Sequence, residues 1–192
     1  RGVSMRRLLV LFFVTLLLGC ASTAPTAPRA TGDLALIIER ASGHVTLAST
    51  TSRQPYARIG GLGDLSHASA VYSRDGRYAY VFGRDGALSK IDMLEARVVK
   101  RVVQSGNAIG GSVSQDGRIV VAQNYTPGGI KAFDTATLEL VADVPAEFEP
   151  GRLSRVVGLV DLPGRRFAYS LFDADAIWIT DLSNPARPVT TK

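Results

Sequence analysis

The chain has 192 residues, of which 46% are hydrophobic and 20% are charged, and its formal net charge is +5. The basic residues are scattered among acidic ones and form no patch that could follow a phosphate backbone, so nucleic acid is not expected as a partner. The single cysteine excludes an internal disulfide, a Cys-x-x-Cys-His heme attachment and a cysteine metal cluster. A surplus of arginine suits a ligand with several carboxylates, which guanidinium groups bind bidentately.

The N-terminal segment has the layout of a signal peptide at residues 1–20. Met5 and two arginines precede an apolar run, Leu8–Leu18, which has 11 residues and is too short to span a bilayer. The run ends in Leu-Leu-Gly-Cys at residues 17–20, which resembles the bacterial lipobox, in which the cysteine is lipidated and becomes the first mature residue. We therefore expect a lipid on Cys20. The alternative is an ordinary signal peptide with an incidental cysteine.

Residues 21–32 are rich in Thr, Ala and Pro, and their low hydrophobicity predicts a flexible tether. With a lipid on Cys20, this tether would hold the following domain near a membrane. The predicted localisation is therefore periplasmic, as a membrane-anchored lipoprotein.

A repeat dominates the rest of the chain. The motif Ser73–Arg77 returns 41 positions later as Ser114–Arg118 and, more loosely, a further 47 positions on as Asp161–Arg165. Four short strands per ~40–45 residues, separated by Asp-Gly and Gly-Gly turns, are the signature of a β-propeller blade. The first full unit contains four predicted strands, at His67–Ser73, Tyr78–Gly83, Ala87–Asp92 and Val98–Val103.

Residues 33–192 are predicted to form part of an all-β propeller domain. A partial unit with strands at Leu34–Ile38 and His44–Ser49 precedes the first full one, so the chain would hold between three and four blades, whereas propellers usually close with ~4–8 blades. We therefore expect a parent domain of about twice this length, with this chain as its N-terminal portion. A closed four-bladed ring is the alternative.

Propeller geometry sorts the connecting loops onto two rims, because the innermost strand of a blade runs from one rim to the other and the second strand runs back. The upper rim is expected to gather the start of each inner strand and the loop between the second and third strands. Alignment of the turn glycines places His67, Ala108 and Arg155 at equivalent inner-strand positions, so that His67 and Arg155 point toward one funnel. The polar side chains expected on this rim are Ser66, His67, Arg84, Asp85, Asn107, Asn124, Tyr125, Thr126, Arg155, Asp173 and Asp175.

Each candidate also has a purely structural interpretation. A lone histidine is more often a packing residue than a ligand, but small neighbours around His67 leave room for a large ligand. An imidazole there could ligate heme iron or transfer protons near neutral pH. Arg84 and Arg155 could equally be solvated loop charges, and Asn124 and Tyr125 could belong to an ordinary turn.

Other chemistry has no motif in this sequence. There is no Gly-x-Ser-x-Gly elbow, no Gly-rich nucleotide loop opening a helix, and no spaced His/Asp/Glu metal set. The Asp-Gly turns of the lower rim are interpreted as structural. His44 is predicted to be a surface residue, and Trp178 to be part of the core.

Longer motifs resemble a known family. They are S-H-A-S-A-V-Y-S-R-D-G-R-Y-A-Y-V-F-G-R-D-G at residues 66–86, I-G-G-S-V-S-Q-D-G-R at 109–118, N-Y-T-P-G-G-I-K-A-F-D at 124–134 and F-D-A-D-A-I-W-I-T-D at 172–181. From about Asp33 to Pro188 the chain resembles the NirF family of heme d1 biosynthesis proteins, which is related to the d1-binding domain of cytochrome cd1 nitrite reductase. The resemblance implies an eight-bladed parent propeller, of which this chain covers about the first four blades.

The resemblance also implies roles for individual residues. In the related reductase, a histidine at the start of an inner strand is an axial ligand of heme d1, and His67 matches it. Arg84 matches an arginine of the site that binds the carboxylated macrocycle. The chain departs from the reductase at Ala70 and at Ile109–Gly111, where the reductase has arginines. These departures favour a d1 precursor or a different pose of the ligand.

The predicted function is binding of heme d1, or of a precursor tetrapyrrole, in the central funnel during a late step of heme d1 biosynthesis. His67 is expected to be an iron ligand or a catalytic proton-transfer group. A dehydrogenase-like tailoring reaction, a non-catalytic tetrapyrrole carrier and a protein-interaction scaffold all stay open. Expected partners are the membrane, other heme d1 assembly proteins and nitrite reductase. The expected binding residues are His67, Arg84, Asn107, Asn124, Tyr125 and Arg155.

Overall fold

The structure, a computed structural model, describes residue 28 and residues 30–192, and every regular element in that part of the chain is a β-strand. The all-β class predicted from the sequence is therefore confirmed. The predicted signal peptide, the lipidation site Cys20 and most of the tether lie outside the described residues. Within the described residues, no helix is long and apolar enough to cross a membrane.

The strands form four antiparallel sheets, each corresponding to one propeller blade, and one short hairpin. The first blade has three strands, β1 (Leu34–Glu39), β2 (His44–Ser49) and β3 (Pro55–Ile59). The second blade contains β4 (Ser69–Tyr72), β5 (Tyr78–Phe82), β6 (Ala87–Asp92) and β7 (Arg97–Val103). The third contains β8 (Asn107–Val113), β9 (Ile119–Thr126), β10 (Ile130–Asp134) and β11 (Leu140–Val144). The fourth contains β14 (Val156–Leu162), β15 (Arg166–Leu171), β16 (Ala176–Asp181) and β17 (Val189–Thr191).

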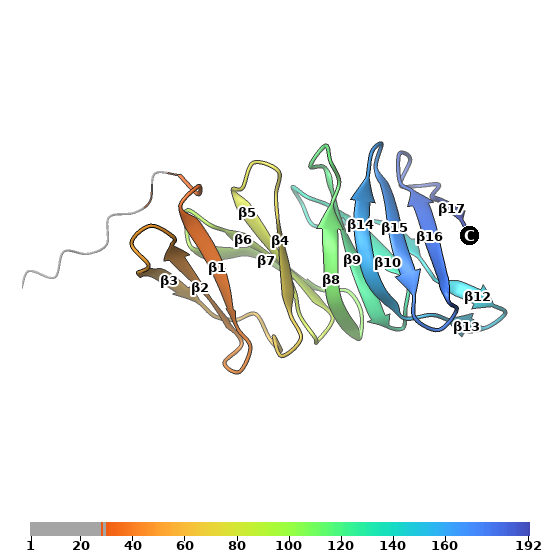
Figure 1. Cartoon of the computed structure of the whole chain (residues 1–192), viewed down its shortest axis with the longest axis horizontal. Coiled ribbons are helices and arrows are strands. Elements are labelled where there is room, and N and C mark those ends of the chain that lie inside the picture. The colour runs from red at the N-terminus through yellow and green to blue at the C-terminus, as the bar shows by residue number, and fades with distance from the viewer. Residues whose placement is uncertain (1–27, 29) are drawn as a thin grey trace, which may run out of the picture.

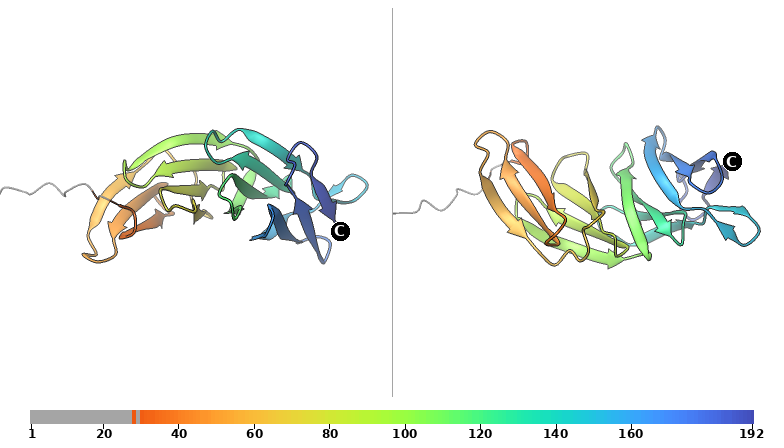
Figure 2. Two further views of the ribbon diagram at one scale, coloured as in Figure 1. Left: turned by 90° about the horizontal axis from the view of Figure 1, so that it is seen from above. Right: turned by 60° about the horizontal axis from the view of Figure 1, so that its bottom comes forward.

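The blades follow one another along an arc, with the first and fourth blades at its two ends (Figures 1 and 2). The inner strand β8 contacts β4 of the preceding blade and β14 of the following blade. Neighbouring blades of a propeller are arranged in this way. Over the described residues the arc does not close, so the alternative of a four-bladed ring is not found.

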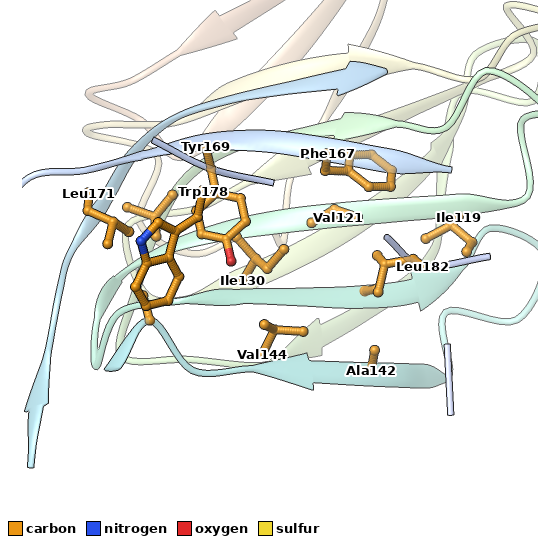
Figure 3. Close-up of a cluster of buried hydrophobic side chains, with 13 residues drawn as sticks. Ile119, Val121, Ile130, Ala142, Val144, Phe167, Tyr169, Leu171, Trp178 and Leu182 are labelled. Atoms are coloured by element: carbon orange, nitrogen blue, oxygen red, sulfur yellow. The ribbon is translucent and has the colours of Figure 1, made fainter. Parts of the chain in front are cut away.

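Apolar side chains fill the space between neighbouring blades. Between the third and fourth blades, Phe167 and Tyr169 from β15 and Trp178 from β16 pack against Val121 and Ile130 (Figure 3). Trp178 is 4% exposed, and its ring meets the Tyr169 ring edge-on with the centroids 6.4 Å apart. Such aromatic pairs add about 0.5–1.5 kcal/mol beyond the burial of apolar area. The prediction that Trp178 is a core residue is confirmed.

One buried charge also joins two blades. Lys90 in β6 is 5% exposed, and its Nζ donates to the main-chain oxygens of Thr135 and Ala136 in the third blade, at 2.7 and 3.2 Å. The ammonium lies 4.1 Å from the centroid of the Tyr78 ring. Burial lowers the pKa of Lys90, and these contacts offset the cost of burying its charge. Strand β6 can therefore be buried along its whole length although it is not wholly apolar.

The Asp-Gly turns lie at the lower rim and are built alike. Ser73 Oγ donates to Asp75 Oδ1 at 2.6 Å, and Asp75 Oδ1 also accepts from the main-chain N of Arg77 at 3.0 Å. The turn Ser114–Arg118 repeats both hydrogen bonds. The glycines of the two turns have φ values of +70° and +74°, which glycine adopts without a Cβ clash. The repeated aspartates therefore stabilise the hairpin turns through these hydrogen bonds.

Two local features differ from the prediction. The inner strand of the second blade begins at Ser69 rather than at His67, so His67 lies in the preceding loop. The connection between the third and fourth blades contains a hairpin, β12 (Glu147–Glu149) and β13 (Arg152–Leu153), for which the repeat gave no signal.

The inner strand β8 passes close to the second blade at Gly111. A Cβ at this position would overlap Phe82 Cζ and the main-chain oxygen of Val121. Glycine is therefore required here, because both Phe82 and the main chain of Val121 lie too close for a side chain. The main chain of Val121 cannot move aside easily, since it belongs to the neighbouring strand β9.

Replacement of Gly111 by alanine is expected to lower the free energy of unfolding by about 1–3 kcal/mol, because the methyl group overpacks the junction between the blades. The matched control is Gly32→Ala, which adds a methyl group where no atom lies within 4 Å, and its expected effect is within about 0.5 kcal/mol. Urea denaturation with equal slopes for all variants measures both changes. Equal stability of the two variants would contradict the close packing at Gly111.

Candidate functional site

A pocket of about 300 Å³ opens on the upper rim, at the junction of the second and third blades. It is lined by His67, Arg84, Asn107, Ile109 and Tyr125. His67 precedes the inner strand β4, Arg84 lies in the β5–β6 loop, and Tyr125 lies near the end of β9. The structure thus brings four of the six expected binding residues to one pocket, from segments that are far apart in the sequence.

His67 projects from a loop that is held by its own polar groups. The main-chain N of Ser66 donates to Asp64 Oδ1 at 2.9 Å, and the main-chain N of Ala68 donates to Leu65 O at 3.0 Å. The imidazole is exposed to solvent rather than enclosed by apolar groups. The hydrogen bond from Ser66 lowers the pKa of Asp64, with smaller contributions from Arg84 and His67. The carboxylate of Asp64 therefore lies near the imidazole of His67.

Arg84 is a cation of the pocket that forms no ion pair within the described residues. Its main-chain N donates to Asp64 O at 2.8 Å, which fixes the loop while the exposed guanidinium stays unpaired. The neighbouring Asp85 is already paired with Arg101 and accepts from the main-chain N of Ala87 at 3.2 Å. The positive charge of Arg84 is therefore available to an anionic ligand.

Asn107, the first residue of β8, has a buried Oδ1 atom without a hydrogen-bond partner in the described part of the chain. An unsatisfied buried acceptor costs about 1–3 kcal/mol, so such groups call for an explanation. Ile109 adds an apolar surface to the same pocket. Asn107 and Ile109 thus line the pocket together with His67 and Arg84, with the Asn107 Oδ1 atom itself buried.

Asn124 does not lie on the pocket, contrary to expectation. Its side chain is fully buried and forms a reciprocal pair with Gln104, in which Gln104 Nε2 donates to Asn124 Oδ1 at 2.8 Å and Asn124 Nδ2 donates to Gln104 Oε1 at 3.0 Å. Both polar ends of its amide are satisfied by protein. Asn124 therefore supports the loop that carries Tyr125 instead of facing a ligand.

Arg155 is on the predicted rim but is not free. Its Nη2 donates to Asp173 Oδ1 at 2.5 Å and its Nη1 donates to Tyr125 Oη at 2.8 Å. These bonds raise the pKa of Arg155, and the bond from Arg155 lowers the pKa of Asp173 to about 2. The expectation that Arg155 binds a ligand carboxylate does not fit this geometry, because its Nε and Nη2 already donate to the carboxylate of Asp173.

The arrangement places an imidazole, an unpaired guanidinium, a tyrosine and an apolar contact on one small surface, and a buried, unpartnered amide oxygen belongs to another lining residue, Asn107. In the described residues, no group of three or more His, Cys, Asp or Glu side chains could hold a metal ion. The sequence pattern did not indicate Asp64 and Ile109 as neighbours of His67. The repeat pattern predicted Arg155 and Asp173 on the same rim, but it did not predict that the two side chains pair.

The pKa of Asp173 predicts how stability depends on pH. Its folded value of about 2 lies below its ordinary value of 3.8, so the pair stabilises the folded state fully above about pH 5 and loses this contribution as the pH falls from about 4 toward 2. Asp173→Asn should make this part of the pH–stability curve less steep. Thermal melting between pH 2 and 6 measures it, and an unchanged curve would contradict the pairing.

Comparison with known proteins gives the following matches. The family described as Cytochrome D1 heme domain matches residues 29–192. Protein NirF of Pseudomonas aeruginosa is 57% identical over 181 residues, covering 93% of this chain and 46% of that protein. Protein NirF of Stutzerimonas stutzeri is 52% identical over 190 residues, covering 98% and 48%. The chain therefore spans about half the length of these curated relatives, and the resemblance to the NirF family is confirmed.

A third relative and a solved structure extend this result. The dihydro-heme d1 dehydrogenase of Pseudomonas aeruginosa is 33% identical over 175 residues, covering 89% of this chain and 35% of that protein. The structure of the dihydro-heme d1 dehydrogenase NirN in complex with DHE matches with a TM-score of 0.75 and 32% identity, over 88% of this chain and 38% of that one. Since the family match extends over nearly all of the described residues, the chain belongs to the cytochrome D1 heme domain family.

Proposed function

We propose that the protein binds heme d1, or a precursor tetrapyrrole, against the upper-rim pocket and acts in heme d1 biosynthesis. The observation that carries the proposal is the convergence of an exposed imidazole, His67, and an unpaired guanidinium, Arg84, on one pocket of a chain in this family. Further support comes from the relatives, since one is a dihydro-heme d1 dehydrogenase and the similar solved structure is a complex with DHE.

The pocket residues fit such a ligand chemically. A tetrapyrrole has a flat apolar ring, which Ile109 can contact, and carboxylates at its edge, which Arg84 can bind bidentately. The iron of a heme offers a coordination position to an imidazole such as that of His67.

Binding is the step shared by the two roles that the sequence left open, a carrier of the tetrapyrrole and an enzyme that modifies it. An exposed imidazole suits both roles. It can hold the iron of a carried heme, or it can exchange a proton with a ligand that is being modified.

A titration of the full natural protein with heme d1, extracted from a cytochrome cd1 nitrite reductase, tests the proposal. We expect binding to shift the absorption spectrum of the heme, and His67→Ala to abolish or alter that shift because an iron ligand is lost. Arg84→Ala should weaken binding about 10- to 100-fold, the range expected for a charge-assisted hydrogen bond of about 1.5–3 kcal/mol.

Two variants serve as matched controls for this titration. His44→Ala removes the other histidine, whose Nδ1 lies 2.6 Å from Ser42 O outside the pocket. Arg118→Ala removes an exposed arginine of a lower-rim turn. Both should bind heme d1 as the unmodified protein does. Absence of binding by the unmodified protein, or equal loss in the controls, would overturn the proposal.

We also propose that the protein is exported and anchored by a lipid on Cys20. Support comes only from the sequence, in which a short apolar segment ends in Leu-Leu-Gly-Cys. Cys20→Ala should move the protein from the membrane fraction of the producing bacterium to the soluble fraction, as measured by fractionation and immunoblotting. A Cys20→Ala protein that is as strongly membrane-bound as the unmodified one would contradict the anchor.

A further inference from the structure

Tyr125 lies between the pocket and Arg155. The role inferred here for these two residues rests on the proposed ligand. Tyr125 lines the pocket, and its Oη accepts a hydrogen bond from Arg155 Nη1 at 2.8 Å. The guanidinium carbon lies 5.1 Å from the centroid of the Tyr125 ring. Arg155 itself is not among the residues that line the pocket. The Tyr125 phenol is thus held by Arg155, a cation outside the lining of the pocket.

The fourth blade holds Arg155 in place. Its Nε donates to Asp173 Oδ1 and Oδ2 at 3.2 and 3.1 Å, and its main-chain N donates to Asp173 Oδ2 at 2.9 Å. The ring of Phe172 covers the guanidinium at 4.0 Å. Bidentate pairing and stacking restrict an arginine strongly. Arg155 is therefore a rigid support for Tyr125, with its carboxylate-binding edge already filled.

The direction of the Tyr125 hydroxyl hydrogen follows from this hydrogen bond. Arginine has only donors, so in the bond from Nη1 the phenol oxygen must be the acceptor. The hydroxyl hydrogen of Tyr125 must then point elsewhere, and within the described residues the bond from Arg155 is the one hydrogen bond formed at this oxygen. Since Tyr125 lines the pocket, an oxygen-bearing ligand group there would be the acceptor.

We infer that Arg155 is a positioning residue, which orients Tyr125 so that the phenol donates a hydrogen bond to an oxygen at the edge of the bound tetrapyrrole. Asp173 balances the charge of Arg155, so this half of the site selects an oxygen acceptor at a fixed place without adding net positive charge. Arg84, another residue of the same pocket, supplies the positive charge. The two contacts recognise different oxygen groups of one ligand.

A double-mutant cycle on heme d1 binding by the full natural protein tests the inference. Tyr125→Phe and Arg155→Met should each weaken binding roughly tenfold, the loss expected for one hydrogen bond. The double variant should bind no more weakly than Tyr125→Phe alone, because Arg155 acts only through the phenol. Tyr125→Phe combined with Arg84→Ala should instead show multiplied losses, as expected for independent contacts. Multiplied losses for Tyr125 and Arg155 would overturn the inference, since Arg155 would then contact the ligand itself.

A measurement without ligand separates this inference from the proposed function. In protein labelled with tyrosine carrying carbon-13 at Cζ, the Tyr125 signal, assigned by its absence in Tyr125→Phe, should shift in Arg155→Met and largely return in Arg155→Lys, which restores a cationic donor. Unchanged Tyr125 signals in folded Arg155→Met would overturn the positioning role, whether or not heme d1 binds. A shifted signal in a protein that binds no heme d1 would overturn the proposed function and the ligand contact, and would leave only the Arg155–Tyr125 bond.

Discussion

The close approach of β8 to the second blade is the constraint on which the rest of the structure depends. Glycine at position 111 lets this inner strand lie against Phe82, and Ser69 Oγ donates to Ile109 O at 3.1 Å across the same junction. Because the inner strands lie side by side, the loops at their upper ends meet. His67 from the second blade and Tyr125 from the third can therefore line one pocket. A wider spacing of the blades would separate the groups that give this pocket its chemistry.

The arginines near the upper rim differ in whether a carboxylate pairs with them. Arg101 is paired with Asp85, and Arg155 is paired with Asp173. Both arginine side chains are partly shielded from solvent, and the paired aspartates balance their charges. Arg84 is exposed and lines the pocket without a carboxylate partner among the described residues. A ligand with carboxylates would thus meet one available cation in this pocket, while the paired arginines lie outside its lining.

The repeat predicted the blades well, because strand order, turn glycines and alternating burial are local properties of the sequence. It also predicted the rim that gathers His67, Arg84, Asn107 and Tyr125, since propeller topology alone fixes which loops share a rim. The pairing of Asn124 with Gln104 and of Arg155 with Asp173 could not be predicted in this way. Whether a rim side chain faces the pocket or another side chain depends on rotamers and loop conformation, which the repeat pattern does not encode.

The site combines one imidazole, one free guanidinium and a supported phenol on a surface that a flat anionic ligand can cover. A crystal structure of the full natural protein with heme d1 tests this account most directly. The account predicts that the macrocycle lies over the junction of the second and third blades, with the His67 imidazole facing its iron and a carboxylate at Arg84. A macrocycle bound at the lower rim, or at a position that leaves His67 and Arg84 both without contact, would contradict it.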